Sequence, residues 1–213
     1  KVHLEVSFGF KEGRTPSRFV VSAKDLVLGY DSALTKPVDV VLERNQKIAV
    51  RGVNGLGKTT LLKTLLGLIK PFAGEVERGD FLQVGYFEQE DSAHNDMTAL
   101  DYIWNAYPAM TNAEVRAALA RCGLTNEHIT SQMRVLSGGE NAKVRLCKLM
   151  QEPYNVLVLD EPTNHLDVAA KEELAYALRR FKGTILVVSH EPEFYRSWIT
   201  DEWNVESWTT KIV

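Results

Sequence analysis

Apolar residues along the chain fall into short runs and into sets with helical spacing. Short apolar runs bounded by turn residues predict strands at positions 19–21, 26–28, 46–50, 84–87, 156–159 and 184–188. The runs at 156–159 and 184–188 are apolar throughout, which is typical of strands that are buried on both faces of a parallel sheet.

Helices are predicted between these strands. The first carries apolar residues at helical spacing from position 61 to 69 and is blocked by Pro71. Further helical segments are predicted at about 97–122, from the N-cap Ser137 to about 152, and at 168–181 after the N-cap Asp167. Alternating strands and helices indicate an α/β fold around a parallel sheet.

The helical stretch at about 91–150 interrupts this alternation, so it is predicted to be an inserted subdomain. We therefore expect one domain over 1–213, with a core and a β subdomain at about 1–90 and 151–213. The length of 213 residues fits one domain of this kind.

Composition and charge narrow the class of protein. The net charge of −3 provides no overall basic field for nucleic acid, although a local basic patch is compatible with it. Cys122 and Cys147 have no neighbouring ligand cluster and are interpreted as reduced thiols.

No apolar run is long enough to span a bilayer and no signal peptide is visible, so we expect a cytoplasmic protein without a membrane partner. The missing initiator Met suggests a piece of a longer chain.

The segment from Gly52 to Thr59 reads Gly-Val-Asn-Gly-Leu-Gly-Lys-Thr and matches the phosphate-loop pattern G-x-x-x-x-G-K-[ST] in full. Glycines let backbone N–H groups approach phosphate oxygens closely, and the start of the following helix adds positive potential. Lys58 is expected to reach the β- and γ-phosphates, and the Thr59 hydroxyl to ligate Mg²⁺.

Two acids, Asp160 and Glu161, end the apolar strand at 156–159. Parallel strands deliver residues at their carboxyl ends to the ligand site, so Asp160 is predicted to bind the Mg²⁺ that Thr59 shares. Glu161 is then placed to orient or deprotonate the attacking water.

His190 ends the next buried strand, where it is predicted to hydrogen-bond the γ-phosphate or the attacking water. Gln89 follows the strand at 84–87, where the core gives way to the helical stretch, and its amide is a candidate contact for Mg²⁺ and water. A structural histidine and a surface glutamine are the alternative interpretations of these two residues.

A second anion-binding element is predicted at Leu136-Ser137-Gly138-Gly139-Glu140, where a hydroxyl and two glycines begin a helix. Because the chain already carries a phosphate loop, the simplest interpretation is that this element serves the nucleotide of another domain.

Together and in this order, these residues resemble the nucleotide-binding domain of the ABC ATPases over essentially the whole chain. In that resemblance Gly52 to Thr59 is Walker A, Gln89 the Q-loop glutamine, Leu136 to Glu140 the signature motif, Val156 to Glu161 Walker B, and His190 the switch histidine. Tyr30 falls where the family has an aromatic residue that stacks on adenine, with a turn aromatic as the alternative.

The resemblance implies a P-loop, RecA-like core with a small antiparallel β subdomain and an inserted helical subdomain. It implies ATP and Mg²⁺ as ligands. The implied catalytic residues are Glu161, His190, Gln89 and Lys58, and the implied Mg²⁺ ligands are Thr59, Gln89 and Asp160. The implied ATP-binding residues are Tyr30, Gly52, Asn54, Gly55, Gly57, Lys58, Thr59 and Thr60. Those acting on a partner domain's nucleotide are Ser137, Gly138, Gly139 and Glu140.

The segment Asn164-His165-Leu166-Asp167 after Walker B resembles the ABC-F branch. Its members carry two ATPase domains in one chain, lack membrane domains and act on the ribosome in translation regulation or ribosome protection. The residues before Tyr30 resemble the entry to the second domain. The chain departs from the branch after His190, which is followed by Glu191-Pro192-Glu193-Phe194, and Walker A has Thr59 where serine is common.

Two rival functions remain open from the sequence. An ATPase subunit of an ABC transporter would share the catalytic motifs, although Asn164-His165 argues against it. A clamp that binds ATP with little turnover would not need Glu161, so the presence of that acid argues for hydrolysis.

Overall fold

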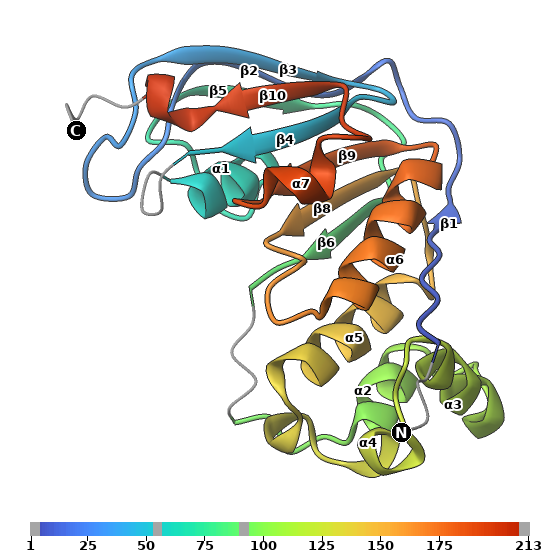
Figure 1. The fold of residues 1–213 in the computed structure, drawn as a ribbon. Helices are drawn as coiled ribbons and strands as arrows, with labels where there is room; N and C mark the ends of the chain where they lie inside the picture. Colours follow the sequence, from blue (N-terminus) through green and yellow to red (C-terminus); the bar gives the residue numbers. More distant parts are fainter. Residues whose placement is uncertain (1–4, 53–56, 90–93, 209–213) are drawn as a thin grey trace. The chain divides into compact units, whose positions relative to one another are not determined.

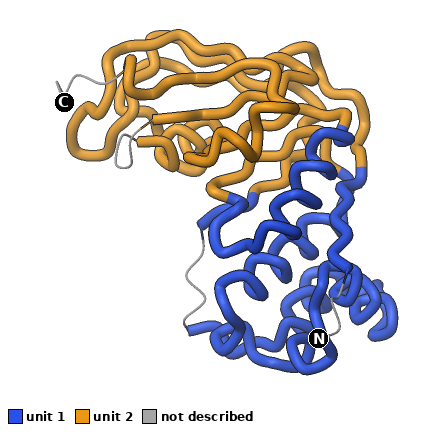
Figure 2. Tube along the Cα trace, viewed as in Figure 1, with its two compact units in different colours: residues 1–11, 87–153, 162–181 blue, residues 12–86, 154–161, 182–213 orange. Residues whose placement is uncertain are grey.

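The computed structural model describes residues 5–52, 57–89 and 94–208. Backbone contacts divide the chain into two compact units (Figure 2). We call the first the helical unit; it comprises Lys1–Lys11, Phe87–Pro153 and Pro162–Phe181. The second, the sheet unit, comprises Glu12–Tyr86, Tyr154–Glu161 and Lys182–Val213.

A five-stranded sheet forms the base of the sheet unit, with the strand order β10-β4-β9-β8-β6 (Figure 1). The strands are β10 (Asp201–Asn204), β4 (Lys47–Arg51), β9 (Thr184–Val188), β8 (Val156–Asp160) and β6 (Val84–Phe87). β10 pairs with β4, β4 with β9 and β9 with β8, each in parallel. The buried strands predicted at 156–159 and 184–188 are thus confirmed as neighbours in a parallel sheet.

The parallel pairing gives this sheet two distinct edges. Val188 of β9 lies opposite both Val50 of β4 and Asp160 of β8, so these three strands end together. We call that side the carboxyl edge, and the opposite side, where the same strands begin, the amino edge.

A three-stranded antiparallel sheet has the order β3-β2-β5, with β2 (Phe19–Val27), β3 (Val38–Glu43) and β5 (Ala73–Arg78). The sequence predicts two separate strands at 19–21 and 26–28, and this prediction is wrong. The structure has one strand, whose register shifts between Ala23 and Leu26 in the pairing with β3 and between Lys24 and Val27 in the pairing with β5. Asp25 has φ 52° at the shift, so the strand continues through a bulge instead of breaking.

Helix α1 (Lys58–Leu65) buries Leu61, Leu62 and Leu65 in a core that also receives side chains from both sheets. The helix ends earlier than Pro71 suggests, because Gly67 adopts φ 77° and turns the chain away. The sheet unit also contains the short helix α7 (Pro192–Tyr195) and the 3-10 helix η2 (Val205–Trp208). β1 (Lys11–Glu12) pairs with β7 (Pro153–Tyr154) in a separate two-stranded sheet.

Side-chain caps fix where the helices of the helical unit begin. These are α2 (Ala99–Ala106), α3 (Asn112–Arg121), α4 (Asn126–Thr130), α5 (Gly138–Leu149) and α6 (Val168–Arg180), with the 3-10 helix η1 (Met133–Val135) before α5. The N-cap side chains of Thr98, Thr111, Thr125, Ser137 and Asp167 each accept a backbone N–H from the first turn.

The N-caps predicted at Ser137 and Asp167 are confirmed. The predicted helical stretch at 97–122 is divided into α2 and α3, because Pro108 disfavours helical backbone at Tyr107, which has φ −131° and ψ 68°.

Within the described residues no helix is both long and apolar enough to cross a membrane. Cys122 and Cys147 are buried free thiols of the helical unit. A hydrogen bond with Cys147 and burial together raise the pKa of Cys122, so this thiol stays protonated at neutral pH.

Candidate functional site

The carboxyl edge of the five-stranded sheet collects the predicted residues of the sheet unit. Gly52 directly follows β4, Asp160 ends β8, and Ser189 and His190 follow β9. The common register of these strands explains why residues far apart in the sequence meet here.

Lys58 is the first residue of α1 and is buried, and its Nζ donates to the Gly52 carbonyl oxygen over 2.9 Å. Gly57 precedes it with φ 82°, a left-handed conformation that glycine adopts without steric cost. The predicted residues Asn54 and Gly55 lie outside the described part of the chain. Thr60 is buried in α1, and its carbonyl oxygen accepts from the Thr64 hydroxyl.

Thr59 and Asp160 meet directly, because the Thr59 hydroxyl donates to Asp160 Oδ2 over 2.8 Å. Asp160 is 1% exposed, and its other oxygen, Oδ1, is buried without a hydrogen-bond partner within the described structure. Burial raises the pKa of Asp160, with a further rise from Glu161 that the Thr59 hydrogen bond and nearby lysines oppose. Mg²⁺ prefers oxygen ligands. The unused, buried oxygen of Asp160 and the neighbouring Thr59 hydroxyl are such ligands, so these two residues fit the metal.

Glu161 lies directly beyond Asp160 and has φ 50°. Its backbone N–H donates to the Val188 carbonyl over 2.8 Å, which ties this turn to β9. His190 Nδ1 is 3.0 Å from both carboxylate oxygens of Glu161, with hydrogen-bond geometry toward Oε1. Glu161 Oε2 is buried without a hydrogen bond from any described residue, while the His190 side chain is 56% exposed.

Tyr30 lies in the turn after β2 and is 62% exposed. A Cβ placed on Gly57 would lie 3.6 Å from Leu34 Cδ1 and 3.9 Å from Leu28 Cδ1. The turn that carries Tyr30 therefore lies beside the start of α1.

The remaining predicted residues belong to the helical unit. Gln89 is exposed and follows Glu88, whose carbonyl oxygen accepts from Arg145 Nη2 of α5. The Arg145 guanidinium also lies over the Phe87 ring, 4.2 Å from its centroid. Arg145 thus holds the backbone directly before Gln89, a contact that no motif in the sequence indicates.

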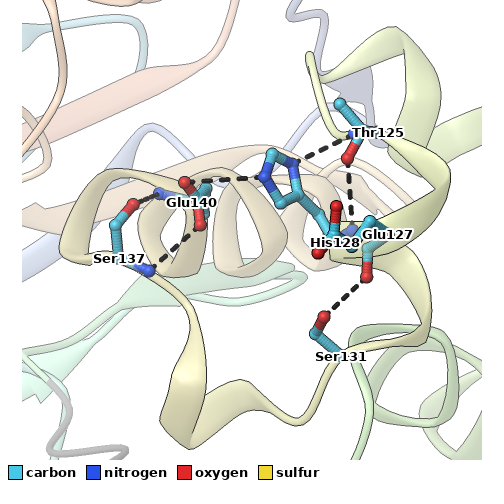
Figure 3. A network of polar contacts seen from close by, with 6 residues as sticks. All are labelled: Thr125, Glu127, His128, Ser131, Ser137 and Glu140. Atoms are coloured by element: carbon cyan, nitrogen blue, oxygen red, sulfur yellow. Dashed lines mark hydrogen bonds and ion pairs between the residues drawn. The ribbon is translucent and has the colours of Figure 1, made fainter.

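Ser137 caps α5 in a reciprocal arrangement (Figure 3). Its hydroxyl oxygen accepts from the Glu140 N–H over 3.2 Å, and its own N–H donates to Glu140 Oε1 over 3.1 Å. His128 Nε2 lies 3.6 Å from Glu140 Oε2. Burial opposes ionisation of Glu140, but the hydrogen bonds from Ser137, together with His128 and Lys143, outweigh it and lower its pKa. Glu140 is therefore ionised at neutral pH and part of the cap.

The two signature glycines leave room for His165. A Cβ on Gly138 would lie 2.6 Å from His165 Cγ, and one on Gly139 would lie 2.7 Å from the His165 carbonyl oxygen. His165 itself has φ 69°. The segment from Asn164 to Asp167 thus packs against the start of α5, which the sequence motifs considered separately do not show.

The structure therefore brings together Lys58, Thr59, Asp160, Glu161 and His190 at one edge of the sheet, with the Tyr30 turn beside α1. Gln89 and the segment Ser137 to Glu140 belong to the other unit.

Comparison with known proteins places this site in a family. Residues 35–164 match the family model of the ABC transporter. The chain is 57% identical over 206 residues to the ABC transporter ATP-binding protein YfmM of Bacillus subtilis, covering 97% of this chain and 40% of that protein. It is 38% identical over 196 residues to ABC transporter F family member 2 of Arabidopsis thaliana, covering 90% of this chain and 29% of that protein. The chain thus spans less than half the length of these curated relatives.

Solved structures share the fold. An ABC transporter ATP-binding protein from Pyrococcus furiosus superposes with a TM-score of 0.72 at 22% identity, covering 89% of this chain and 99% of that one. The dimeric structure of a bacterial ABC transporter cassette also gives 0.72, at 19% identity, covering 87% and 94% of the two chains. The predicted cassette fold, with a parallel core sheet and an antiparallel β subdomain, is confirmed. The chain belongs to the ABC transporter family, as an ATPase domain whose curated relatives include members of the F branch.

Proposed function

We propose that this domain binds ATP with Mg²⁺ and hydrolyses it when it is paired with a second ABC ATPase domain. The observation that carries the proposal is the meeting of Thr59, Asp160 and Glu161 at the carboxyl edge. A hydroxyl and a carboxylate suited to a cation lie there beside a second carboxylate, which His190 contacts.

Binding of the phosphates is assigned to the start of α1. Lys58 exchanges its hydrogen bond to the Gly52 carbonyl for hydrogen bonds to phosphate oxygens. The N–H groups of the first helical turn form the positive end of the helix dipole and also attract the phosphates. Tyr30, exposed beside this turn, is the proposed platform for adenine.

Thr59 and Asp160 would hold Mg²⁺. The role of Gln89 as a further ligand stays a prediction from its place in the sequence. When bound, the metal neutralises charge on the β- and γ-phosphates. Occupation of this site by a cation would also relieve the unfavourable burial of the Asp160 carboxylate.

We assign to Glu161 the role of orienting or deprotonating the attacking water. Its Oε2 is buried and has an unused acceptor position, while His190 hydrogen-bonds Oε1 and so fixes the orientation of the carboxylate. Because the His190 ring is largely exposed, its outer nitrogen remains accessible to the γ-phosphate. His190 thereby links the orientation of Glu161 to the presence of that phosphate.

Ser137 is assigned to the nucleotide of a second ATPase domain. Its hydroxyl oxygen accepts from Glu140, so its own proton remains available to donate to a phosphate oxygen. The N–H groups of Gly138 and Gly139 begin the same helix. The sheet unit already offers its own phosphate-binding helix, which makes a second nucleotide the natural target of this one.

For the whole protein we propose the role of an ABC-F protein that acts on the ribosome. Support comes from the identity with F family relatives over about nine tenths of the chain and from the Asn164-His165 segment that packs on the signature helix. Co-sedimentation of the full-length protein with ribosomes in ATP tests this. A full-length protein that instead associates with membranes would favour a transporter subunit.

The variant Glu161→Gln tests hydrolysis in the full-length protein. It keeps the size of the side chain but removes the carboxylate, so turnover is expected to fall by roughly 10²–10⁴-fold. ATP affinity should change little, because in the described structure no hydrogen bond joins Glu161 to Lys58 or Thr59. Glu172→Gln, on the exposed side of α6, is the matched control and should turn over normally. Undiminished turnover in Glu161→Gln would contradict the proposal.

A further inference from the structure

An open cavity of about 280 Å³ lies at the amino edge of the five-stranded sheet, within the sheet unit. Asn155 and Gly183, the residues directly before β8 and β9, line it, as does Asn45 shortly before β4. Residues 12–16 and Tyr154 complete the wall together with Arg44 and Lys182. Because these strands are parallel, the cavity lies at the opposite edge from Asp160 and is separate from the proposed ATP site.

The lining is positively charged although the whole chain carries −3. It contains the three cations Arg14, Arg44 and Lys182 and one carboxylate, that of Glu12. None of the three cations forms an ion pair with a carboxylate in the part of the chain that the structure describes. An unpaired group of cations around a concave surface attracts anions.

The backbone that carries Arg14 is held in place by the sheet. Gln83 Oε1 accepts from the Arg14 N–H over 2.8 Å, and Asn155 Nδ2 donates to the Arg14 carbonyl over 2.9 Å. Asn155 is only 4% exposed, and Gly13 donates to the Tyr154 carbonyl over 2.7 Å. A Cβ on Gly13 would lie 2.2 Å from Gln83 Oε1, so this close approach requires glycine.

The two guanidinium groups are also positioned. The Arg14 guanidinium lies over the Phe81 ring, 4.1 Å from its centroid, and this stacking restrains the group without using its N–H donors. Arg44 Nη1 donates to the Pro16 carbonyl over 3.0 Å and keeps four further N–H donors. Planar groups of N–H donors match the paired oxygens of a phosphate group.

We propose that this cavity binds a phosphate group, carried either by an RNA backbone or by a small phosphate compound. The volume accommodates such a group, and three cations suit a ligand with more negative charge than a single carboxylate. The interaction is independent of ATP hydrolysis, since it uses the other edge of the sheet.

Residue-resolved titration tests the proposal on the unaltered protein. In amide NMR spectra, inorganic pyrophosphate or a short RNA hairpin should shift the signals of Gly13 and Gly183 in the cavity. Shifts at Gly57 report the ATP site separately, so binding there is not mistaken for binding in the cavity. Shifts with pyrophosphate identify a small phosphate compound as sufficient, and shifts with RNA alone identify the nucleic-acid backbone as the source.

A charge-matched pair of variants adds a second measurement. Arg44→Gln with Lys182→Gln should weaken binding of the effective probe about tenfold and reduce the salt dependence of RNA binding by about one unit of slope per cation. Lys24→Gln with Lys36→Gln, which removes two exposed cations outside the cavity, should have little effect. Unshifted Gly13 and Gly183 signals with both probes, or equal losses in the two double variants, would overturn the proposal.

Discussion

Helices α1 and α5 are both proposed to bind phosphate, but they start in different ways. α1 follows Gly57, which has φ 82° and no side chain with which to cap the helix. α5 follows Ser137, whose hydroxyl and whose partner Glu140 complete a capping box. Loss of a side-chain cap typically costs about 1 kcal/mol.

The start of α1 would therefore gain hydrogen-bond partners when an anion binds, whereas the start of α5 is already capped without a ligand. The N–H groups at the start of α1 donate no hydrogen bond to a side chain of the N-cap residue, whereas the start of α5 is already organised by Ser137 and Glu140. A rigid, capped helix start can present one hydroxyl to a nucleotide that arrives with another domain. We therefore expect substitutions at α1 to affect ATP binding and those at α5 to affect turnover.

The largest effect is expected at Lys58. Lys58→Ala removes the side-chain cation at the start of α1, so Mg-ATP binding should become undetectable in a calorimetric titration. Lys63→Ala is the matched control, since it removes the same charge from the last turn of the same helix. Retained affinity in Lys58→Ala would show that the phosphates are bound elsewhere.

A pH-dependent effect is expected at Asp160, which α1 contacts through Thr59. Burial raises the pKa of Asp160 above its ordinary 3.8, so its ionised form destabilises the folded state. The penalty appears as pH rises from 3.8 through the raised folded value and is complete at higher pH.

Asp160→Asn should therefore increase the free energy of unfolding near neutral pH, measured by denaturant titration without ATP or Mg²⁺. The gain should disappear below the unfolded pKa. Asp31→Asn, in an exposed turn, is the control and should alter stability little at either pH. A neutral-pH destabilisation by Asp160→Asn would contradict the interpretation that this carboxylate awaits a cation.

The smallest effect on stability, and the sharpest distinction between the two helix starts, is expected at Ser137. Ser137→Ala should lower the unfolding free energy by about 1 kcal/mol, whereas Ser137→Gly should lower it by only a few tenths. If the hydroxyl contacts a second nucleotide, both variants should lose turnover to the same extent. Turnover that follows stability, and so is retained in Ser137→Gly, would limit Ser137 to capping.

The sequence predicts best the elements whose signals are local and strong. The apolar runs of β8 and β9 and the caps Ser137 and Asp167 lie where their residue types indicate. Strands β5 and β10 are missed because their sequences, Ala-Gly-Glu-Val-Glu-Arg and Asp-Glu-Trp-Asn, remain mostly exposed and lack an apolar run. The shift in β2 at Asp25 depends on pairing with two other strands, which no local pattern contains.

The candidate site divides in the same way. Motifs name Lys58, Thr59, Asp160, Glu161 and His190, and the parallel sheet explains why they meet. The proximity of His165 to Gly138 and the hold of Arg145 on Glu88 depend on tertiary packing, so the motifs alone do not indicate them. The catalytic and ligand roles of all these residues, and the insertion boundaries at about 91 and 150, stay predictions.

The dependence of ATP turnover on chain concentration tests most directly the claim that the two helix starts serve different nucleotides. If α1 binds the chain's own ATP and Ser137 acts on the ATP of another domain, the isolated chain should bind ATP but hydrolyse it slowly. Turnover per chain should then rise with concentration as domains pair. Rapid turnover that is strictly proportional to chain concentration, without dimer formation, would contradict the account.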